Sequence, residues 1–296
     1  MSASGAPKVS IHVISYNQER YIAEALESAV NQEYPNLEVV VSDDASTDGT
    51  GEIIREIQAA HPRKIIALFN QANAGITVNA NKALQACSGD YIAFLGGDDV
   101  FLPGKIAAQM AWFLEDPNRV LCGHKTDVFY EDGSRAPKLD RETCREGVGP
   151  ELIIRDGAPF CGSAVMVKAS AIPPHGFDET IPIASDLLFW IDVLSSGGAF
   201  GYVDGVYARY RRHASNISAR HADMLQDVER SYRIVAAKYP RYRDLCMDAI
   251  TRHVVYFGGV RHLTAGDKAA ARRQFLRTIR MKPLFTKAWL RLLQTL

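Results

Sequence analysis

Two pairs of neighbouring aspartates have the side chains that bind nucleotides and metal ions. Asp43 and Asp44 follow one apolar run of the chain, and Asp98 and Asp99 follow another. The oxygens of the first pair can accept hydrogen bonds from a base N–H and from ribose hydroxyls. The oxygens of the second pair are hard ligands, which suit Mg²⁺ or Mn²⁺ bound together with substrate phosphates. The sequence therefore predicts a nucleotide site at the first pair and a divalent-metal site at the second.

Two glycines, and a group of basic residues much later in the sequence, are further candidates for binding a ligand at these acidic pairs. Gly96 and Gly97 precede the second acidic pair and would let a ligand approach the backbone closely. No GxGxxG motif follows the first apolar run, and no P-loop motif occurs, so the metal and basic side chains would have to hold a diphosphate. The basic candidates are Arg209, Arg211, Arg212 and His213. Alternatively, these residues belong to a strand whose charges are simply solvated.

Asp186 is a further acidic candidate, because it directly precedes the apolar run Leu187–Trp190. An aspartate at the start of a helix commonly accepts hydrogen bonds from the free N–H groups of the first turn. Taken by itself, this residue is more typical of a helix cap than of a functional group.

The segments that must position these residues alternate between strand and helix. Apolar, β-branched runs predict strands, and apolar residues at a spacing of three and four predict helices. Repeated strand–helix–strand units with short connections favour a parallel sheet, in which ligands bind beyond the carboxyl ends of the strands. The expected strands are 9–15, 37–42, 65–69 and 91–95, and helices are expected after residue 17, around 53–57 and over 78–86.

The rest of the chain is expected to complete one α/β domain and add a helical extension. The predicted boundaries are 1–221 for the α/β domain and 222–296 for the extension. Within the first part, the polar stretch 131–150 is predicted to form a mobile loop. A strand is predicted over 202–210, and Gly205 is expected to interrupt it. The remaining expected elements are helices at 103–114 and 187–194 and strands at 120–130 and 163–168.

Composition and charge place the chain in a broad class. Its 47% hydrophobic and 23% charged residues are ordinary for a globular protein. Five scattered cysteines without a CxxC pair indicate neither a zinc site nor a disulfide framework. We expect a cytoplasmic protein, because the N-terminus does not read as a signal peptide and no apolar stretch is long enough to span a bilayer.

Taken in order along residues 8–218, the motifs resemble glycosyltransferase family 2. Each motif is weak alone, but the ordered set is specific. It comprises Ser15-Tyr16-Asn17 with Glu19, the DDxSxDxT pattern from Asp43 to Thr50, Asn73-Ala74-Gly75, Asn79 and Asn81, Gly89-Asp90-Tyr91, Asp98-Asp99 with Pro103, Gly176-Phe177-Asp178-Glu179, Asp186, and Tyr210-Arg211-Arg212-His213 leading to Asn216-Ile217-Ser218.

The resemblance implies a GT-A fold and a role for each matching residue. Tyr16 would stack on the nucleotide base, Asp43 or Asp44 would bond that base, and Asn73 would belong to the same nucleotide site. Asp98 and Asp99 match the metal-binding DxD region, with Asp99 as the favoured direct ligand. His213 and the nearby arginines, Arg209 and Arg212 among them, would hold the diphosphate or complete the metal shell. Asp186 matches the general base that deprotonates the acceptor hydroxyl.

Three departures from the family pattern concern the same site. Many relatives have an aspartate where this chain has Gly96, so the metal site has one carboxylate fewer. A glutamate often precedes the catalytic aspartate, where this chain has Ser185. Proline is frequent at the position of Ser15. The first departure bears on metal affinity, and the other two bear on contacts of the base and the acceptor.

The function implied by the resemblance is inverting transfer of a sugar from a nucleoside-diphosphate sugar, specifically a UDP-sugar, to a hydroxyl acceptor. The cofactor would be Mn²⁺ or Mg²⁺. The acceptor would be a glycan or a lipid-linked molecule of cell-surface polysaccharide or glycoconjugate synthesis, and no nucleic acid is expected as a partner. Two alternatives stay open: a nucleotidylyltransferase that makes nucleotide sugars, and a non-catalytic module of the same fold that only binds nucleotide.

The charge of the chain is unevenly distributed along its length. Residues 222–296 contain 15 Lys+Arg and 6 Asp+Glu, a charge of +9, which leaves −9 for residues 1–221. Near the end, apolar residues line one face of a predicted final helix, and no acid follows residue 267. Either this face packs on the catalytic domain and the charges are solvated, or the basic tail rests peripherally on the inner face of an anionic membrane.

Overall fold

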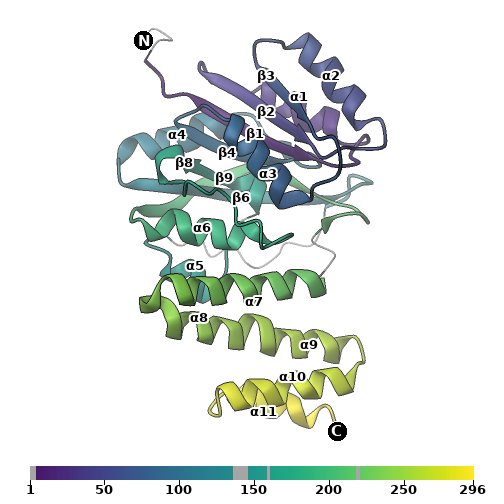
Figure 1. Ribbon diagram of the computed structural model, residues 1–296, viewed down its shortest axis with the longest axis vertical. Coiled ribbons are helices and arrows are strands. Elements are labelled where there is room, and N and C mark those ends of the chain that lie inside the picture. The colour runs from purple at the N-terminus through teal and green to yellow at the C-terminus, as the bar shows by residue number, and fades with distance from the viewer. Residues whose placement is uncertain (1–4, 136–145, 159–160, 218–220) are drawn as a thin grey trace. The chain divides into compact units, whose positions relative to one another are not determined.

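The computed structural model describes residues 5–135, 146–158, 161–217 and 221–296 (Figure 1). The chain forms two compact units. The first comprises residues Met1–Pro150 and Ala158–Ala219, and the second comprises Glu151–Gly157 and Arg220–Leu296. The sequence places the division between residues 221 and 222, whereas the contacts divide the chain two residues earlier and assign a short internal helix to the second unit.

A nine-stranded sheet forms the centre of the first unit, in the order β3-β2-β1-β4-β8-β6-β9-β5 with β7 paired to β9. The pairs β1–β2, β2–β3, β1–β4 and β6–β9 are parallel, and the pairs that involve β5, β7 and β8 are antiparallel. The strands are β1 Val9–Ser15, β2 Leu37–Asp43, β3 Ile65–Phe69, β4 Tyr91–Gly96, β5 Val100–Phe101, β6 Arg119–Tyr130, β7 Gly147–Val148, β8 Met166–Lys168 and β9 Ala199–Arg212.

Helices cover both faces of this sheet, as the alternating side chains of the strands require. Val9, Ile11 and Val13 point to one face and pack with apolar residues of α1, α2 and α4. His12 and Phe94 point to the other face, towards α3 and α6. The helices of this unit are α1 Ile22–Val30, α2 Thr50–Ala60, α3 Ile76–Ala86, α4 Lys105–Glu115 and α6 Ser185–Ser195.

Most predicted elements are present within one to three residues of their expected ends, but two predictions are wrong in detail. The expected strand 163–168 is only β8, because Gly162–Ala164 forms a 3-10 turn first. The expected loop 131–150 contains the short strand β7, and residues 136–145 of that loop lie outside the described part of the chain.

The predicted interruption at Gly205 is a bulge in β9. His124 pairs with Val203 and the next residue, Lys125, pairs with Val206, so Asp204 and Gly205 between these two pairs have no partner in β6. Gly205 has a φ of +135°, a conformation that a residue with a Cβ rarely adopts. The bulge lets one long strand pair first with the beginning and then with the end of β6.

The second unit is entirely helical in its described residues. Its core is built from the apolar faces of successive helices and includes the buried side chains of Tyr232, Ile250 and Phe275. Asp267 caps α10 by accepting a hydrogen bond from the Ala270 N–H at 2.9 Å. The helices are α5 Glu151–Asp156, α7 His221–Lys238, α8 Arg243–Ala249, the π-helical stretch Ile250–Tyr256, α9 Phe257–Thr264, α10 Lys268–Met281 and α11 Thr286–Leu293.

Among the described residues, no helix has both the length and the apolar character that crossing a membrane requires.

We predict that the buried His12 makes the first unit less stable in mild acid. Burial lowers the pKa of His12 to about 4, and its Nε2 lies 2.9 Å from the Ala80 carbonyl oxygen. The unfolded chain, with an ordinary histidine pKa of about 6.5, binds the proton first as the pH falls. Between about pH 7 and about pH 5, the free energy of unfolding should therefore fall by about 2 kcal/mol on account of this residue.

Urea unfolding of wild type and His12→Gln at the two pH values measures this effect. The glutamine can still donate a hydrogen bond to the Ala80 carbonyl oxygen but cannot titrate. Between the two pH values, the free energy of unfolding of His12→Gln should therefore fall by about 2 kcal/mol less than that of wild type. His61→Gln, at the end of α2 and outside the core, is the matched control and should behave as wild type. Identical pH dependence of wild type and His12→Gln would show that His12 is not the responsible group.

Candidate active site

The four predicted aspartates lie at one edge of the sheet. β1, β2 and β4 are parallel neighbours, so their carboxyl ends meet. Ser15 at the end of β1 pairs with Asp43, and Ile14 pairs with Gly96. The fold therefore brings the two acidic pairs together, although more than fifty residues separate them in the sequence.

Asp43 and Asp44 are both buried and hold the loops around them. Asp43 accepts hydrogen bonds from the Ser15 hydroxyl at 3.0 Å and from the hydroxyl and N–H of Ser46 at 2.5 and 2.9 Å. Asp44 accepts from the Asn70 amide at 2.6 Å and from the N–H groups of Ala74 and Gly75 at 2.8 Å each. Each carboxylate thus accepts most of its possible hydrogen bonds from other groups of the protein.

Asp44 in this way fixes the loop that carries Asn73, the exposed residue before Ala74. The loop at the end of β1 is fixed in a similar manner. Asn17 donates its N–H to the Ser46 hydroxyl at 2.8 Å and accepts from the Thr47 N–H at 2.8 Å. Asn17 itself has a φ of +51°, and such backbone outliers cluster at functional sites. The neighbouring Tyr16 ring remains 46% exposed and is free to stack on a flat ligand.

Asp99 is a buried junction between three segments. Its Oδ2 accepts a hydrogen bond from the Ser163 hydroxyl at 2.5 Å, and its Oδ1 accepts from the Arg211 N–H at 2.9 Å. The same Ser163 oxygen accepts from the Gly96 N–H at 3.0 Å. Burial, followed by the neighbouring charge of Asp98, raises the pKa of Asp99 to about 8. Both oxygens of Asp99 are therefore engaged inside the protein.

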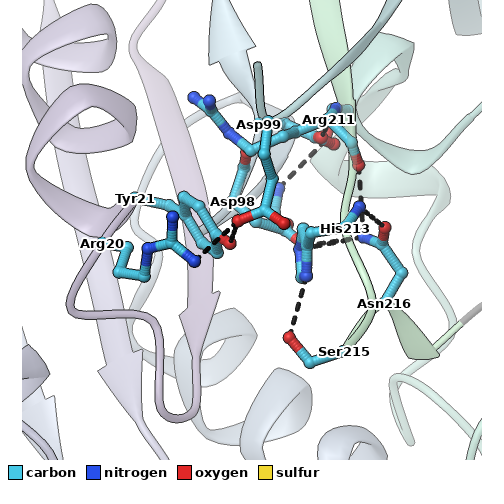
Figure 2. Close-up of polar contacts among 11 residues, drawn as sticks. Arg20, Tyr21, Asp98, Asp99, Arg211, His213, Ser215 and Asn216 are labelled. Atoms are coloured by element: carbon cyan, nitrogen blue, oxygen red, sulfur yellow. Dashed lines mark hydrogen bonds and ion pairs between the residues drawn. The ribbon is translucent and has the colours of Figure 1, made fainter. Parts of the chain in front are cut away.

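Asp98 instead faces a small polar cluster at the end of β9 (Figure 2). Its Oδ2 lies 2.9 Å from His213 Nε2 and accepts from the Asn216 amide at 3.2 Å. The opposite ring nitrogen of His213 lies 2.8 Å from the Ser215 hydroxyl. Asp98 Oδ1 accepts no hydrogen bond from any residue that the structure describes. This oxygen is therefore free of protein hydrogen bonds among the described residues, whereas both ring nitrogens of His213 are engaged.

Aromatic and ionic contacts of Tyr21 and Arg211 support the cluster formed by Asp98, His213 and Asn216. The Tyr21 ring packs on the His213 ring with centroids 4.7 Å apart, and the Tyr21 hydroxyl bonds to Glu131. The Arg211 guanidinium lies over the Tyr21 ring at 5.1 Å, donates to the Asp98 carbonyl oxygen at 2.9 Å and pairs with Glu24. Arg211 is thus a buried structural residue that orients the turn at Asp98 and Asp99.

The other two arginines of the predicted basic set differ from each other. Arg209 lies over the Phe129 ring at 3.9 Å and near Asp127, with Nε and Oδ2 3.5 Å apart. Arg212 is half-buried and, among the described residues, has no carboxylate within ion-pair distance. Of the arginines in this strand, Arg212 is therefore the one whose charge is not already balanced.

The residues around Asp98 fit a divalent ion that is shared with a ligand. No group of three or more His, Cys, Asp or Glu side chains is arranged to hold a metal in the described parts of the chain. Asp98 and His213 supply two donors, and Mg²⁺ or Mn²⁺ commonly completes its shell with water and substrate phosphates. A Cβ at Gly96 would lie 2.8 Å from Asp98 Oδ1, so an aspartate there would require Asp98 to move. Asp99, the expected direct ligand, has both oxygens bonded within the protein, whereas Asp98 Oδ1 has no hydrogen bond among the described residues.

Asp186 is the second residue of α6, whose N-cap position is Ala184, and its carboxylate accepts a hydrogen bond from the Leu187 N–H at 2.8 Å. The residue as a whole is exposed to solvent. The protein atoms around its carboxyl group disfavour the charged form, and this raises the pKa of Asp186 above its ordinary value. The Thr77 hydroxyl links the start of α3 to the segment before α6, through the Ile181 carbonyl oxygen at 2.6 Å and the Ser185 hydroxyl at 3.1 Å. Asp186 thus sits at a helix start that is tied to the loop held by Asp44.

Several residues that shape the site are absent from the set predicted by sequence. Ser163 and Asn216 bond directly to the two aspartates, and Tyr21 supports His213. Asn216 belongs to a motif of the family resemblance, which was the one signal available for it. Ser163 and Tyr21 have no local signal, because a serine at a turn and a tyrosine beside a helix are common in any α/β protein.

We predict different stability effects for substitutions at the two neighbouring aspartates. Asp99→Ala leaves the buried Arg211 N–H and the Ser163 hydroxyl without an acceptor, so the free energy of unfolding should fall by about 2–4 kcal/mol. Asp98→Asn keeps the side-chain shape at a partly exposed position and should cost less than about 1 kcal/mol. Urea unfolding of both variants in chelator measures the difference. Equal stabilities would contradict the burial of Asp99.

Comparison with known proteins identifies the family. The model of "Glycosyl transferase family 2" matches residues 10–171. The EpsE protein of Bacillus subtilis (strain 168) is 34% identical over 168 residues, which is 57% of this chain and 59% of EpsE. The chain thus spans about three fifths of the length of the first curated relatives that it matches.

Solved structures share the fold over almost the whole chain. The TarS 1–349 structure from S. aureus in complex with UDP-GlcNAc has a TM-score of 0.66 at 18% identity, covering 97% of this chain and 89% of that chain. The mannosyltransferase PcManGT from Pyrobaculum calidifontis in complex with GDP-Man and Mn²⁺ has a TM-score of 0.65 at 18% identity, covering 99% and 87%. These likenesses confirm the predicted fold. Because the family model covers more than half of its residues, the chain belongs to glycosyltransferase family 2.

Proposed function

We propose that this chain is an inverting glycosyltransferase that moves a sugar from a UDP-sugar to the hydroxyl of a glycan or lipid-linked acceptor. The observation that carries the proposal is the pairing of Asp98 with His213 beside the loops fixed by Asp43 and Asp44. In a family 2 chain, this edge of the sheet has the donors and acceptors that a nucleoside diphosphate needs. The synthesis of a cell-surface polysaccharide or glycoconjugate is the role that we propose for it.

The nucleotide would bind along the ends of β1 and β2. The exposed Tyr16 ring would stack on the base, and Asp43 and the loop of Asn73 would line the base and ribose. Arg212, whose charge is unbalanced among the described residues, would contact the diphosphate. The complex of TarS with UDP-GlcNAc supports a UDP-sugar, whereas that of PcManGT contains GDP-Man.

Asp98 and His213 would hold a Mn²⁺ or Mg²⁺ ion against the diphosphate. When bound, such an ion would supply positive charge that stabilises the leaving diphosphate. Tyr21 and Asn216 hold the two side chains next to each other. The Mn²⁺ in the PcManGT complex supports a metal in this fold.

Asp186 would act as the general base. It would take the proton of the acceptor hydroxyl while that oxygen forms a bond to the anomeric carbon. The bond from the anomeric carbon to the diphosphate oxygen breaks at the same time, and its electron pair leaves with the nucleoside diphosphate. A raised pKa makes the carboxylate a stronger base. A single base opposite the leaving group implies inversion at that carbon.

The metal proposal predicts that donor binding depends on Asp98. Native-state binding raises the melting temperature by mass action, so UDP-sugar plus Mn²⁺ should stabilise wild type more than either alone and more than GDP-sugar plus Mn²⁺. Asp98→Asn should lose the metal-dependent part of this stabilisation and about 100-fold or more in transfer rate. Asp204→Asn, an exposed aspartate on β9, should behave as wild type. Full activity in excess chelator would rule out the metal role.

The base proposal predicts that Asp186→Asn separates catalysis from donor binding. The rate of sugar transfer should fall by about 10²–10⁴-fold, because the acceptor proton has lost its base. Donor affinity measured by calorimetry should stay within about twofold of wild type, because the base acts on the acceptor. Parallel loss of donor affinity would instead indicate that Asp186 has only a structural role at the start of α6. Retained configuration at the anomeric carbon of the product, read by NMR, would contradict inversion.

A further inference from the structure

Helix α11 has two apolar faces, of which only one is packed. Ala288 is buried and Leu292 is half-buried, and these residues pack within the second unit. On another face Trp289 is 50% exposed, and Leu290 and Leu293 are each 65% exposed. We call Trp289, Leu290, Leu293 and the 77% exposed Leu296 the apolar stripe; the first three lie along one side of α11, and Leu296 follows the end of the helix. A helix that only packs on its neighbours needs one apolar face and not two.

The cations of the same helical hairpin are unusually free. From Lys268 to Leu296 the sequence contains eight Lys and Arg residues and no acid. Arg277 pairs with Glu229 and Lys282 pairs with Asp248, both outside this stretch. The exposed residues that lack a carboxylate partner, as far as the described residues show, are Lys268, Arg272, Arg273, Arg280 and Lys287.

We propose that the α10–α11 hairpin docks on the surface of an anionic lipid bilayer. The apolar stripe would enter the boundary between headgroups and acyl chains, where Trp and Leu side chains are stabilised. The free cations would contact the anionic headgroups while their alkyl stems lie along the apolar region. This inference concerns the second unit alone and goes beyond the proposed sugar transfer.

The charge of the hairpin favours a membrane over a second copy of the chain. An apolar stripe buried against its own symmetry mate would bring two acid-free stretches together, and like charges at an interface are unfavourable. An anionic surface instead gives every free cation a counter-charge. Soluble proteins rarely leave a contiguous apolar patch exposed unless it has a binding partner.

Vesicle sedimentation of the whole chain tests the proposal without any donor or acceptor. At low salt, wild type should bind phosphatidylglycerol-containing vesicles and not pure phosphatidylcholine vesicles, and added salt should weaken the binding. Leu290→Ser with Leu293→Ser should abolish sedimentation. Leu114→Ser, at a 62% exposed leucine of α4, is the matched control and should bind as wild type.

A second pair of variants tests the charge. Arg272→Gln with Arg273→Gln should weaken binding on the order of tenfold or more, because each cation near an anionic surface strengthens it several-fold. Arg63→Gln with Arg243→Gln removes the same charge from exposed positions elsewhere and should have little effect. Equal loss in both double variants would mean that only net charge matters and would overturn the docking surface.

Fluorescence and sedimentation velocity complete the test. Vesicles should shift the emission of Trp289 to shorter wavelength, and Trp289→Phe should remove the shift, since Trp190 is buried and Trp112 is half-buried. Failure of wild type to bind anionic vesicles at low salt would overturn the proposal. A dimer that dissociates on Leu290→Ser with Leu293→Ser, in a protein that does not bind vesicles, would assign the stripe to a second copy instead.

Discussion

The hydrogen bonds that the buried Asp99 carboxylate accepts are the contact on which the candidate site depends. They join the end of β4 to Ser163 and to the backbone of Arg211 in β9, three segments far apart in the sequence. A buried carboxylate is tolerated only when its oxygens are satisfied, so the three segments must meet in one geometry. That geometry directs Asp98 outward and brings His213 within 2.9 Å of it. Asp99 thereby positions Asp98, the residue beside it.

Other buried carboxylates along the same edge of the sheet also hold loops through hydrogen bonds. Asp44 holds the loop before α3 through two backbone N–H groups, and Asp43 holds the turn after β2. Loops would otherwise sample many conformations, and fixing them before a ligand binds removes that entropic cost from binding. The acidic character of the site therefore serves two purposes: some carboxylates build the loops, and others remain available to a ligand.

The two units differ in how they use charge. In the first, carboxylates are satisfied by backbone and hydroxyl donors in the interior, whereas the second concentrates free cations on the outside of a helical hairpin. Its interior is closed by apolar contacts such as that of Phe275, whose ring leaves no room for a Cβ at Gly259. The predicted boundary divides the chain into parts with net charges of −9 and +9.

The sequence by itself determined the alternation of strands and helices and the parallel strand ends that carry the two acidic pairs. Local periodicity and ordered motifs encode these features, because each depends on residues that are near one another in the chain. Only the tertiary structure decided which of the adjacent Asp98 and Asp99 is buried, since their surroundings come from β9 and from Ser163. It also decided that α5 joins the second unit and that α11 leaves an apolar stripe uncovered. Packing partners distant in sequence set burial, and no local pattern records them.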